Sequence, residues 1–410
     1  MALKKKIYVT TNGCEMRSLE ATKISNYFLK NGYELTDKPQ RADLIIFLTC
    51  GVVERNVKDS LKKINELKKY PGRFVVMGCL PATNKEEILK IFNGEILSTQ
   101  DLNYIDNLFP ENKIKFNEIE DATTLIKDFK QNPTKLYIYN RLKEIIKNYG
   151  YRNFFTKYSI LYHQYVKKPY VIKISNGCLG DCTFCVVKKA VGELKSKPID
   201  KCKKEFMKGL NQGNKYVLIT GDDTGSYGLD IDKTFPELLD NLTEIPGDYE
   251  IFIRGLRPKW ISKYIDELQE IFKRNKITRI DVPIQSGSSR ILKLMHRYSD
   301  TEKIKKDLNK LKKNSSKLKI DIHYMLGFPT ETREEFFENL DYIVDIKPNS
   351  GTILPFSAMP HTKSEKIEPK VSKREINYRL NYAAKFLKKE KYKVSYIRKM
   401  SFISYGKKQN

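Results

Sequence analysis

The chain has 410 residues, of which 40% are hydrophobic and 31% charged, so it is long enough for two or three domains and too apolar to be disordered. Lys and Arg number 76 against 50 Asp and Glu, and the formal net charge of +26 favours a polyanion such as RNA as partner. The opening residues lack a leader-like apolar run and no stretch is long enough to span a bilayer, which predicts a cytoplasmic protein.

Residues 1–110 alternate short apolar runs with amphipathic stretches. The runs KKIYVTTNGC, ADLIIFLTC and RFVVMGC are each followed by a segment with helical periodicity. Continuous apolar runs separated by helices are typical of parallel strands that are buried on both faces. This block is therefore expected to be an α/β domain built on a parallel sheet.

Each of these three runs ends on a cysteine, namely Cys14, Cys50 and Cys79. The carboxyl ends of parallel strands meet at one edge of the sheet, where ligands commonly bind, so the three thiols are expected to face one another. Three converging thiolates suit an iron–sulfur cluster that keeps one iron without a protein ligand. The alternative is that they are small buried hydrophobic residues.

Residues 111–168 follow a different pattern. They show weak helical periodicity, no alternation of strands and helices, and many Tyr and Phe beside Lys and Arg. Two interpretations stay open, a packed helical connector and a surface whose aromatic rings stack on nucleic-acid bases.

In residues 169–362 the alternation of apolar runs and helical segments returns. Six such units predict a partial (β/α)6 barrel whose chemistry lies at the carboxyl ends of its strands. The six runs are PYVIKIS, KYVLITG, YEIFIRGL, RIDVPIQS, LKIDIHYMLGFP and GTILPFSAMP.

Three further cysteines, Cys178, Cys182 and Cys185, form a CxxxCxxC motif directly after the first of these runs. Cys202 and His163 are poorly placed to add a fourth ligand, which argues against a zinc site, and Cys202 is expected to be a packing residue or a free thiol in a helical segment. Three thiolates on one loop can hold three corners of a [4Fe–4S] cluster and leave the fourth iron open. With only four histidines, no His/Asp or Ser/His constellation is expected.

The last block, residues 363–410, carries fifteen Lys and Arg against four Asp and Glu. The pattern predicts a basic amphipathic helix followed by a short tail. One or two strands could form there, but a five-stranded barrel would need more chain than remains.

The CxxxCxxC loop resembles the signature of the radical S-adenosylmethionine (SAM) superfamily. The three-cysteine domain ahead of it resembles the methylthiotransferase family, which converts a C–H bond to C–SCH3 on tRNA adenosine or on a ribosomal-protein aspartate. The motifs GCLGDCTFCVVKKA and GDDTGSYGLD are most similar to the archaeal and eukaryotic branch that acts on N6-threonylcarbamoyladenosine at position 37 of tRNA. The other motifs that carry the resemblance are TNGCEM, FLTCGVVERNVKDSL, VVMGCLP, VPIQSGSSRILKLMHR, YMLGFPTET and FSAMP.

The resemblance implies two [4Fe–4S] clusters and SAM as cofactors. The cluster of the CxxxCxxC loop would pass an electron from a donor such as ferredoxin or flavodoxin to SAM, which yields a radical that removes hydrogen from carbon. The N-terminal thiols would hold an auxiliary cluster that carries the sulfur to be inserted, and a second SAM would supply the methyl group. No side chain is then needed as an acid or base, because the chemistry occurs at the clusters.

The resemblance also implies SAM contacts in four strand-end segments, although turn chemistry alone could explain the same residues. These contacts are Gly221, Asp222, Asp223 and Thr224, then Arg254, then Gln285 and Ser286, then Gly327 and Phe328. The family usually has Gln at the position of Asp222. It has Arg and Asn where Phe252 and Arg257 stand, so Arg254 or Arg257 is expected to substitute. The family's Arg-Gly pair after the cysteine loop reads Val191-Gly192 here, and the family's C-terminal TRAM barrel has no counterpart.

The leading hypothesis is a methylthiotransferase that modifies C2 of N6-threonylcarbamoyladenosine at position 37 of tRNA. The missing TRAM barrel and the unusual 111–168 segment favour the alternative, an enzyme that modifies a peptide or protein side chain. A third hypothesis, an iron–sulfur scaffold or redox sensor, would not need a barrel with SAM-type loops. Steep salt dependence of tRNA binding would favour the first hypothesis over the second.

Overall fold

The computed structural model describes residues 4–125, 169–397 and 402–407. These residues divide into two compact units. The first unit contains residues 4–125 together with Cys185–Glu193, and the second contains the other described residues. Among the helices described, none is long and apolar enough to cross a membrane.

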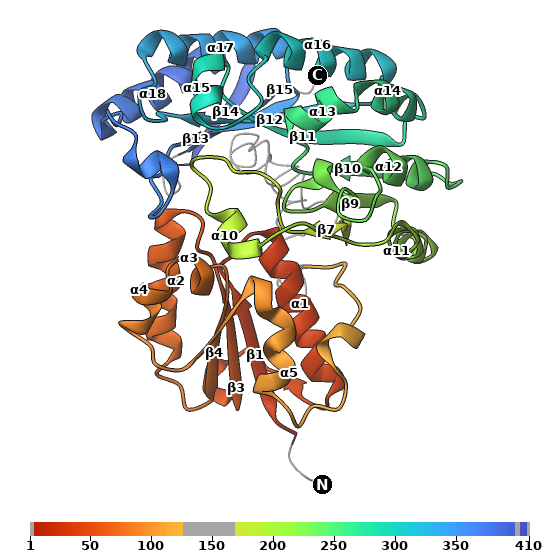
Figure 1. The fold of residues 1–410 in the computed structure, drawn as a ribbon, viewed down its shortest axis with the longest axis vertical. Helices are drawn as coiled ribbons and strands as arrows, with labels where there is room; N and C mark the ends of the chain where they lie inside the picture. Colours follow the sequence, from red (N-terminus) through yellow and green to blue (C-terminus); the bar gives the residue numbers. More distant parts are fainter. Residues whose placement is uncertain (1–3, 126–168, 398–401, 408–410) are drawn as a thin grey trace, which may run out of the picture. The chain divides into compact units, whose positions relative to one another are not determined.

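The first unit is built on a parallel sheet with strand order β2-β1-β3-β4-β5 and helices on both faces (Figure 1). The three predicted strands are confirmed as β1, β3 and β4, and two shorter strands, β2 and β5, extend the sheet at its edges. The strands are β1 Lys6–Thr11, β2 Glu34–Leu35, β3 Leu44–Thr49, β4 Arg73–Gly78 and β5 Glu95–Ser98. The α-helices are α1 Glu15–Lys30, α2 Glu54–Leu67, α3 Leu80–Thr83, α4 Lys85–Leu89, α5 Ile105–Leu108 and α10 Val187–Val191.

The core of this unit continues past the boundary expected at residue 110. Phe28 of α1 packs edge to face against Phe109, with ring centroids 4.8 Å apart. Phe116 and Ile119 are buried in the same core, although the sequence assigns them to a connector. They belong to the N-terminal unit because their apolar side chains cover its helices. The rest of the 111–168 prediction, from residue 126 on, lies outside the described residues.

The second unit contains, in its described part, a sheet with strand order β14-β15-β13-β12-β11-β10-β9-β6. Strands β6 to β13 in this sheet are parallel, which confirms the six predicted strands of the partial barrel. The strands of this unit are β6 Tyr170–Lys173, β7 Ser175–Asn176, β8 Lys195–Ser196, β9 Tyr216–Thr220, β10 Glu250–Ile253, β11 Ile277–Gln285, β12 Lys319–Leu326, β13 Ser350–Pro355, β14 Tyr392–Ile397 and β15 Phe402–Lys407.

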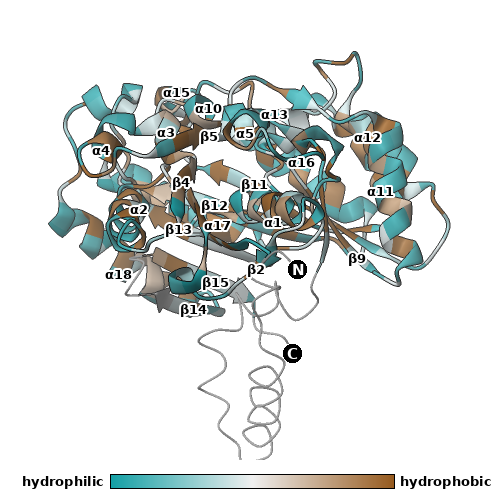
Figure 2. Cartoon of the chain, turned by 90° about the horizontal axis from the view of Figure 1, so that it is seen from below, coloured by the Kyte–Doolittle hydropathy of each residue, from teal (hydrophilic) through white to brown (hydrophobic). Residues whose placement is uncertain are grey.

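Helices separate the parallel strands and cover the outer face of the sheet. They are amphipathic, and Figure 2 shows hydrophobic and hydrophilic sides on α11 and α12. Their apolar sides form one continuous core with the strands. The α-helices of this unit are α11 Ile199–Asn211, α12 Phe235–Thr243, α13 Pro258–Lys263, α14 Ile265–Lys273, α15 Ser289–Leu294, α16 Thr301–Asn314, α17 Arg333–Ile346 and α18 Lys373–Lys389.

The C-terminal segment is part of the barrel unit, which corrects the expectation of a separate basic tail. The predicted helix is present as α18, and its apolar residues Leu380, Ala383 and Leu387 are buried in the barrel core. The hairpin β14–β15 then pairs antiparallel with β13 and extends the sheet. Leu380, Ala383 and Leu387 are three and four positions apart, so they lie on one face of α18, which packs against the barrel.

Candidate functional site

The CxxxCxxC loop follows β6, as predicted, and several hydrogen bonds fix its path. Gly177 donates its N–H to Asp222 Oδ2 at 3.0 Å. Thr183, in the middle of the motif, donates its hydroxyl to the carbonyl of Leu294 at 2.8 Å and its N–H to that of Met295 at 3.1 Å. The loop is therefore held at the carboxyl end of the barrel strands.

Each thiol of this loop has a nitrogen donor beside it. Gly180 N–H points at Cys178 Sγ (3.2 Å), Val187 N–H at Cys185 Sγ (3.3 Å), and Arg297 Nη1 at Cys182 Sγ (3.6 Å). Hydrogen bonds to sulfur stabilise the negative charge of cluster thiolates and help to set their reduction potential. The donor set therefore suits a cluster held by Cys178, Cys182 and Cys185.

A buried charge network lies directly beneath the loop. Arg257 forms a two-pronged ion pair with Asp223, whose side chain is fully buried and also accepts a hydrogen bond from Trp260 Nε1 at 2.9 Å. Burial alone would lower the pKa of Arg257, but Asp223 and the thiols Cys178 and Cys182 outweigh it and raise the pKa. Arg257 thus places a positive charge beside two of the thiols.

The N-terminal cysteines stand where their strands end. Cys14 is exposed at the start of α1, Cys50 follows β3 and is buried, and Cys79 follows β4 and is buried. Burial is the main cause that raises the pKa of Cys79, to about 12, and the charges of Cys14 and Cys50 contribute in the same direction, so the three thiols lie within electrostatic reach of one another. Asn56 donates from Nδ2 to Cys50 Sγ at 3.3 Å.

A buried arginine, Arg17, accompanies these thiols and was not identified from the sequence. Its side chain is 1% exposed, and Nη1 donates to Cys79 Sγ at 3.3 Å and to Thr99 Oγ1 at 2.5 Å. Its Nη2 pairs with Glu20 at 2.8 Å. Arg17 lowers the pKa of Cys79 against the effect of burial. A permanent cation at this position favours the thiolate, which is the form that binds metal.

Among the described residues, no three His, Cys, Asp or Glu side chains are gathered closely enough to hold a single metal ion. A [4Fe–4S] cube places its thiolates farther apart than one ion does, because each sulfur binds a different iron. Soft thiolates with nitrogen donors and a nearby guanidinium fit such a cube better than they fit zinc, which prefers a closed tetrahedron. The donor chemistry of both cysteine trios is therefore compatible with iron–sulfur ligation.

The expected SAM residues lie at the strand ends, and several of them bind other protein groups. Thr224 donates its hydroxyl to the carbonyl of Arg254 at 2.6 Å, and Ser286 donates to Asn339 Oδ1 at 3.0 Å. Gly327 N–H donates to Glu331 Oε2 at 2.7 Å, and Phe328 is buried in an apolar cluster. Gly221 has no room for a side chain, since a Cβ would lie 2.6 Å from Ser175 Oγ. Gln285 is half-buried with φ +82° at the end of β11.

A polar network on the inner strands corrects the expectation that no His/Asp constellation exists. His323 of β12 forms an ion pair with Asp281 of β11, and its Nδ1 contacts Thr352 of β13. Two residues earlier on each strand, Arg279 of β11 pairs with Asp321 of β12. The signal in the sequence was the alternation of polar residues in RIDVPIQ and KIDIHYML, where every second side chain shares a face.

Two family profiles match the chain. Residues 6–98 match the family described as uncharacterized protein family UPF0004, and residues 172–343 match the radical SAM superfamily. A probable threonylcarbamoyladenosine tRNA methylthiotransferase of Methanocaldococcus jannaschii is 28% identical over 395 residues, which cover 94% of this chain and 85% of that protein. The ribosomal protein uS12 methylthiotransferase RimO of Thermosipho africanus is 30% identical over 347 residues, which cover 82% of this chain and 72% of that protein. This chain belongs to the radical SAM methylthiotransferase family.

The solved structures support the fold of this methylthiotransferase. The radical SAM methyltransferase TsrM of Kitasatospora setae, with cobalamin and a [4Fe–4S] cluster bound, superposes with a TM-score of 0.60 at 11% identity. The match covers 88% of this chain and 77% of that chain, and at this identity it concerns the fold alone. Membership of the radical SAM superfamily implies SAM and a [4Fe–4S] cluster as cofactors of the enzyme.

The His323–Asp281 pair makes the stability of this methylthiotransferase depend on pH. Burial would raise the pKa of Asp281, but His323 outweighs it and lowers the pKa, so the stabilisation is lost as pH falls through that lowered pKa. Burial would lower the pKa of His323, but Asp281 outweighs it and raises the pKa, so the stabilisation is lost as pH rises through that raised pKa.

We expect His323→Gln to cost roughly 2 kcal/mol of unfolding free energy at pH 6, the worth of a charge-assisted hydrogen bond. At a higher pH, above the raised pKa of His323, the cost should be smaller, because the histidine of the wild type has then lost its proton. Urea unfolding followed by the fluorescence of Trp260, the only tryptophan, measures both values. An equal cost at both pH values would contradict the charged pair.

Proposed function

We propose that this enzyme inserts sulfur and a methyl group at C2 of N6-threonylcarbamoyladenosine at position 37 of tRNA. The observation that carries the proposal is the pair of cysteine trios, one after the strands of the N-terminal sheet and one on the loop after β6, in a chain whose Methanocaldococcus jannaschii relative is named as a probable threonylcarbamoyladenosine tRNA methylthiotransferase. Conversion of C–H to C–SCH3 needs both a hydrogen-abstracting radical and a sulfur donor. Two separate sets of thiolates can supply these two functions.

In this proposal Cys178, Cys182 and Cys185 bind the cluster that delivers an electron to SAM. The positive charge of Arg257 and the N–H donors on each sulfur stabilise the thiolates. Asp222 keeps the loop in place through Gly177, and Asp223 keeps Arg257 in place. Asp222 and Asp223 are thus proposed to act on the cofactor site indirectly, by positioning Gly177 and Arg257. The backbone of Gly221–Thr224 offers contacts to SAM.

Cys14, Cys50 and Cys79 are proposed to bind the second, auxiliary cluster, whose free iron would carry the sulfur. Two of these thiols are buried, and burial lowers the local dielectric and excludes water from a reactive sulfur. Arg17 offsets part of the negative charge that such a cluster brings into the unit. Cys14, Cys50 and Cys79 follow β1, β3 and β4, which run parallel and end at the same edge of the sheet.

Two observations bear on the substrate. The net charge of +26 favours a tRNA, whose phosphates release counterions when Lys and Arg bind them. The relative from Thermosipho africanus, however, is named for a ribosomal protein, which keeps protein methylthiolation as the second candidate. An electron donor such as ferredoxin or flavodoxin is part of the proposal, because SAM cleavage consumes an electron.

A strain that lacks the gene tests the tRNA substrate. We expect total tRNA of the deletion strain, digested to nucleosides, to lose the methylthio form of threonylcarbamoyladenosine. Threonylcarbamoyladenosine without the methylthio group should accumulate in its place. Complementation with the wild-type gene should restore the product, whereas a Cys182→Ala gene should not. Mass spectrometry of the nucleosides measures the ratio. An unchanged nucleoside profile would exclude tRNA and point to a methylthiolated protein.

A further inference from the structure

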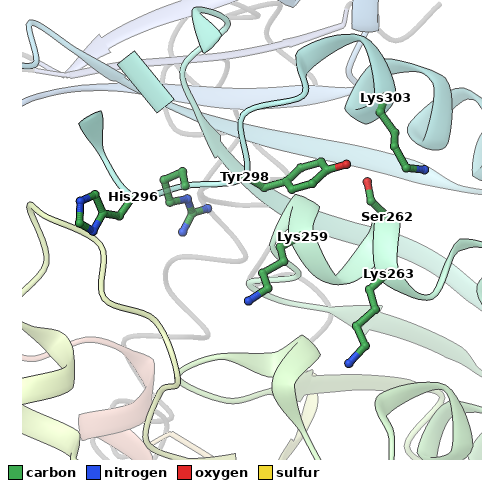
Figure 3. A pocket seen from close by; sticks show the side chains of 7 residues that line it. Lys259, Ser262, Lys263, His296, Tyr298 and Lys303 are labelled. Atoms are coloured by element: carbon green, nitrogen blue, oxygen red, sulfur yellow. The ribbon is translucent and has the colours of Figure 1, made fainter. Parts of the chain in front are cut away.

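A basic cavity of about 500 Å³ opens on the barrel unit. It is formed by α13, by the residues between α15 and α16, and by the first turn of α16 (Figure 3). Four of its seven lining residues are Lys or Arg and none is Asp or Glu. The lining residues are Lys259, Ser262, Lys263, His296, Arg297, Tyr298 and Lys303.

Aromatic rings help to position the amino groups of this basic cavity. Lys259 and Lys263 stand one helical turn apart on α13, and their amino groups lie 5.0 and 5.6 Å from the ring centre of the buried Trp260. Lys263 also lies 5.0 Å from the ring of Tyr264. Lys303 pairs with the buried Asp307 at 3.0 Å. The two lysines of α13 are exposed, so their charge is available to a partner.

The basic cavity is continuous with the CxxxCxxC loop. A smaller cavity of about 90 Å³ shares four of its lining residues and is also lined by residues 179–181 of the loop. Arg297 belongs to both cavities and donates from Nη1 to Cys182 Sγ at 3.6 Å. Leu179, at the tip of the loop, is 44% exposed. One side chain therefore connects the cationic surface directly to a thiol of the motif.

We propose that the basic cavity is the docking surface of an acidic one-electron carrier protein, which reduces the cluster through its Cys182 side. This inference rests on the proposed role of Cys178, Cys182 and Cys185 as cluster ligands. Electron transfer weakens steeply with distance, so the carrier must approach the loop closely, and the cavity lies against it. Opposite charges speed the encounter of two proteins and fix its orientation.

The same surface fits a carrier better than it fits the nucleic-acid substrate. The substrate must reach SAM, whose expected contacts lie at the ends of the strands. The basic cavity is instead built from α13, the first turn of α16 and the loop between α15 and α16. In the proposed step the carrier loses one electron and the cluster gains it, and no bond forms or breaks.

The test uses reconstituted holoenzyme carrying Lys259→Glu and Lys263→Glu together. The matched control carries Lys201→Glu and Lys204→Glu, two exposed lysines of α11 whose replacement changes the net charge equally. Reduced flavodoxin of net negative charge is the probe. Its dissociation constant is measured by titration, and 5′-deoxyadenosine formation is measured with flavodoxin and with dithionite. We expect the dissociation constant to rise at least about tenfold in the test variant, as for rim charges that steer association. The ratio of flavodoxin-driven to dithionite-driven cleavage should fall by a similar factor, while the control changes less than about twofold.

Equal flavodoxin binding by the test and control variants would overturn the proposal. A tenfold loss of tRNA affinity with an unchanged flavodoxin-to-dithionite ratio would also overturn it and assign the surface to RNA. A different result would contradict the proposed role of Cys178, Cys182 and Cys185 as cluster ligands: wild-type enzyme that cleaves no SAM with dithionite. The flavodoxin dissociation constants still decide the docking surface in that case.

Discussion

Replacement of Cys14, Cys50 and Cys79 together by Ala is expected to lower the iron content from about eight to about four atoms per chain. SAM cleavage should continue, because the CxxxCxxC loop lies in a different part of the chain and keeps its own donors. Methylthiolated product should fall by about three orders of magnitude or more, since removal of a required reacting group leaves only background chemistry. Iron analysis after anaerobic reconstitution and product assay by mass spectrometry give the two values.

Cys202→Ala is the matched control for this triple variant. Cys202 is fully buried in the barrel core, and its thiol donates to the backbone carbonyl of Lys197 at 3.8 Å. Its replacement should leave about eight irons per chain. The auxiliary cluster would be disproved if the triple variant kept all its iron. It would also be disproved if the variant lost SAM cleavage and product together while remaining folded.

Most of the strands could be predicted, because buried strands correspond to continuous apolar runs in the sequence. Residues Leu44–Thr49 of β3 are all buried, so the run is apolar without interruption. Strands β2 and β5 escaped prediction for the opposite reason. Leu35 of β2 is 41% exposed, and β5 is mostly half-buried. Edge strands exist through backbone pairing to a neighbour, and a single sequence contains no signal for that pairing.

The C-terminal hairpin shows a similar limit. The sequence predicts a short tail after the basic helix, in which one or two strands could form. In the structure Ile353 of β13 pairs with Ile403 of β15, and Gly351 pairs with Tyr405. The hairpin is stable because it uses an edge that the six parallel strands leave open. Which edge a segment joins depends on the complete sheet and not on the segment.

The site was predictable where the chemistry is local and unpredictable where it depends on pairs of distant residues. Cysteines at strand ends can be read from the alternation of runs alone. The role of Arg17 could not be predicted, because it depends on a contact with Cys79, which is 62 residues away in the sequence. The Asp281–His323 pair likewise joins two strands. Of the two arginines expected to substitute in the third strand segment, Arg257 lies beside the thiols, whereas Arg254 acts on Asp281.

The second large effect is expected from Arg257→Met. Met preserves most of the side-chain volume but leaves the carboxylate of Asp223 buried with Trp260 as its remaining side-chain donor among the described contacts. Loss of one partner from a buried ion pair costs about 3–5 kcal/mol, because the remaining charge is neither solvated nor paired. We expect the unfolding free energy of the barrel unit to fall by that amount. Trp260 lies in this network and is the only tryptophan, so its fluorescence reports the transition directly.

The double variant Arg257→Met with Asp223→Asn separates the charge from the packing. Asn keeps an oxygen that can accept from Trp260 Nε1 but carries no charge, so the double variant should lose only about 1–2 kcal/mol. The difference between the single and the double variant then measures the penalty of an unpaired buried carboxylate. Equal losses in the single and double variants would mean that Arg257 acts by packing alone.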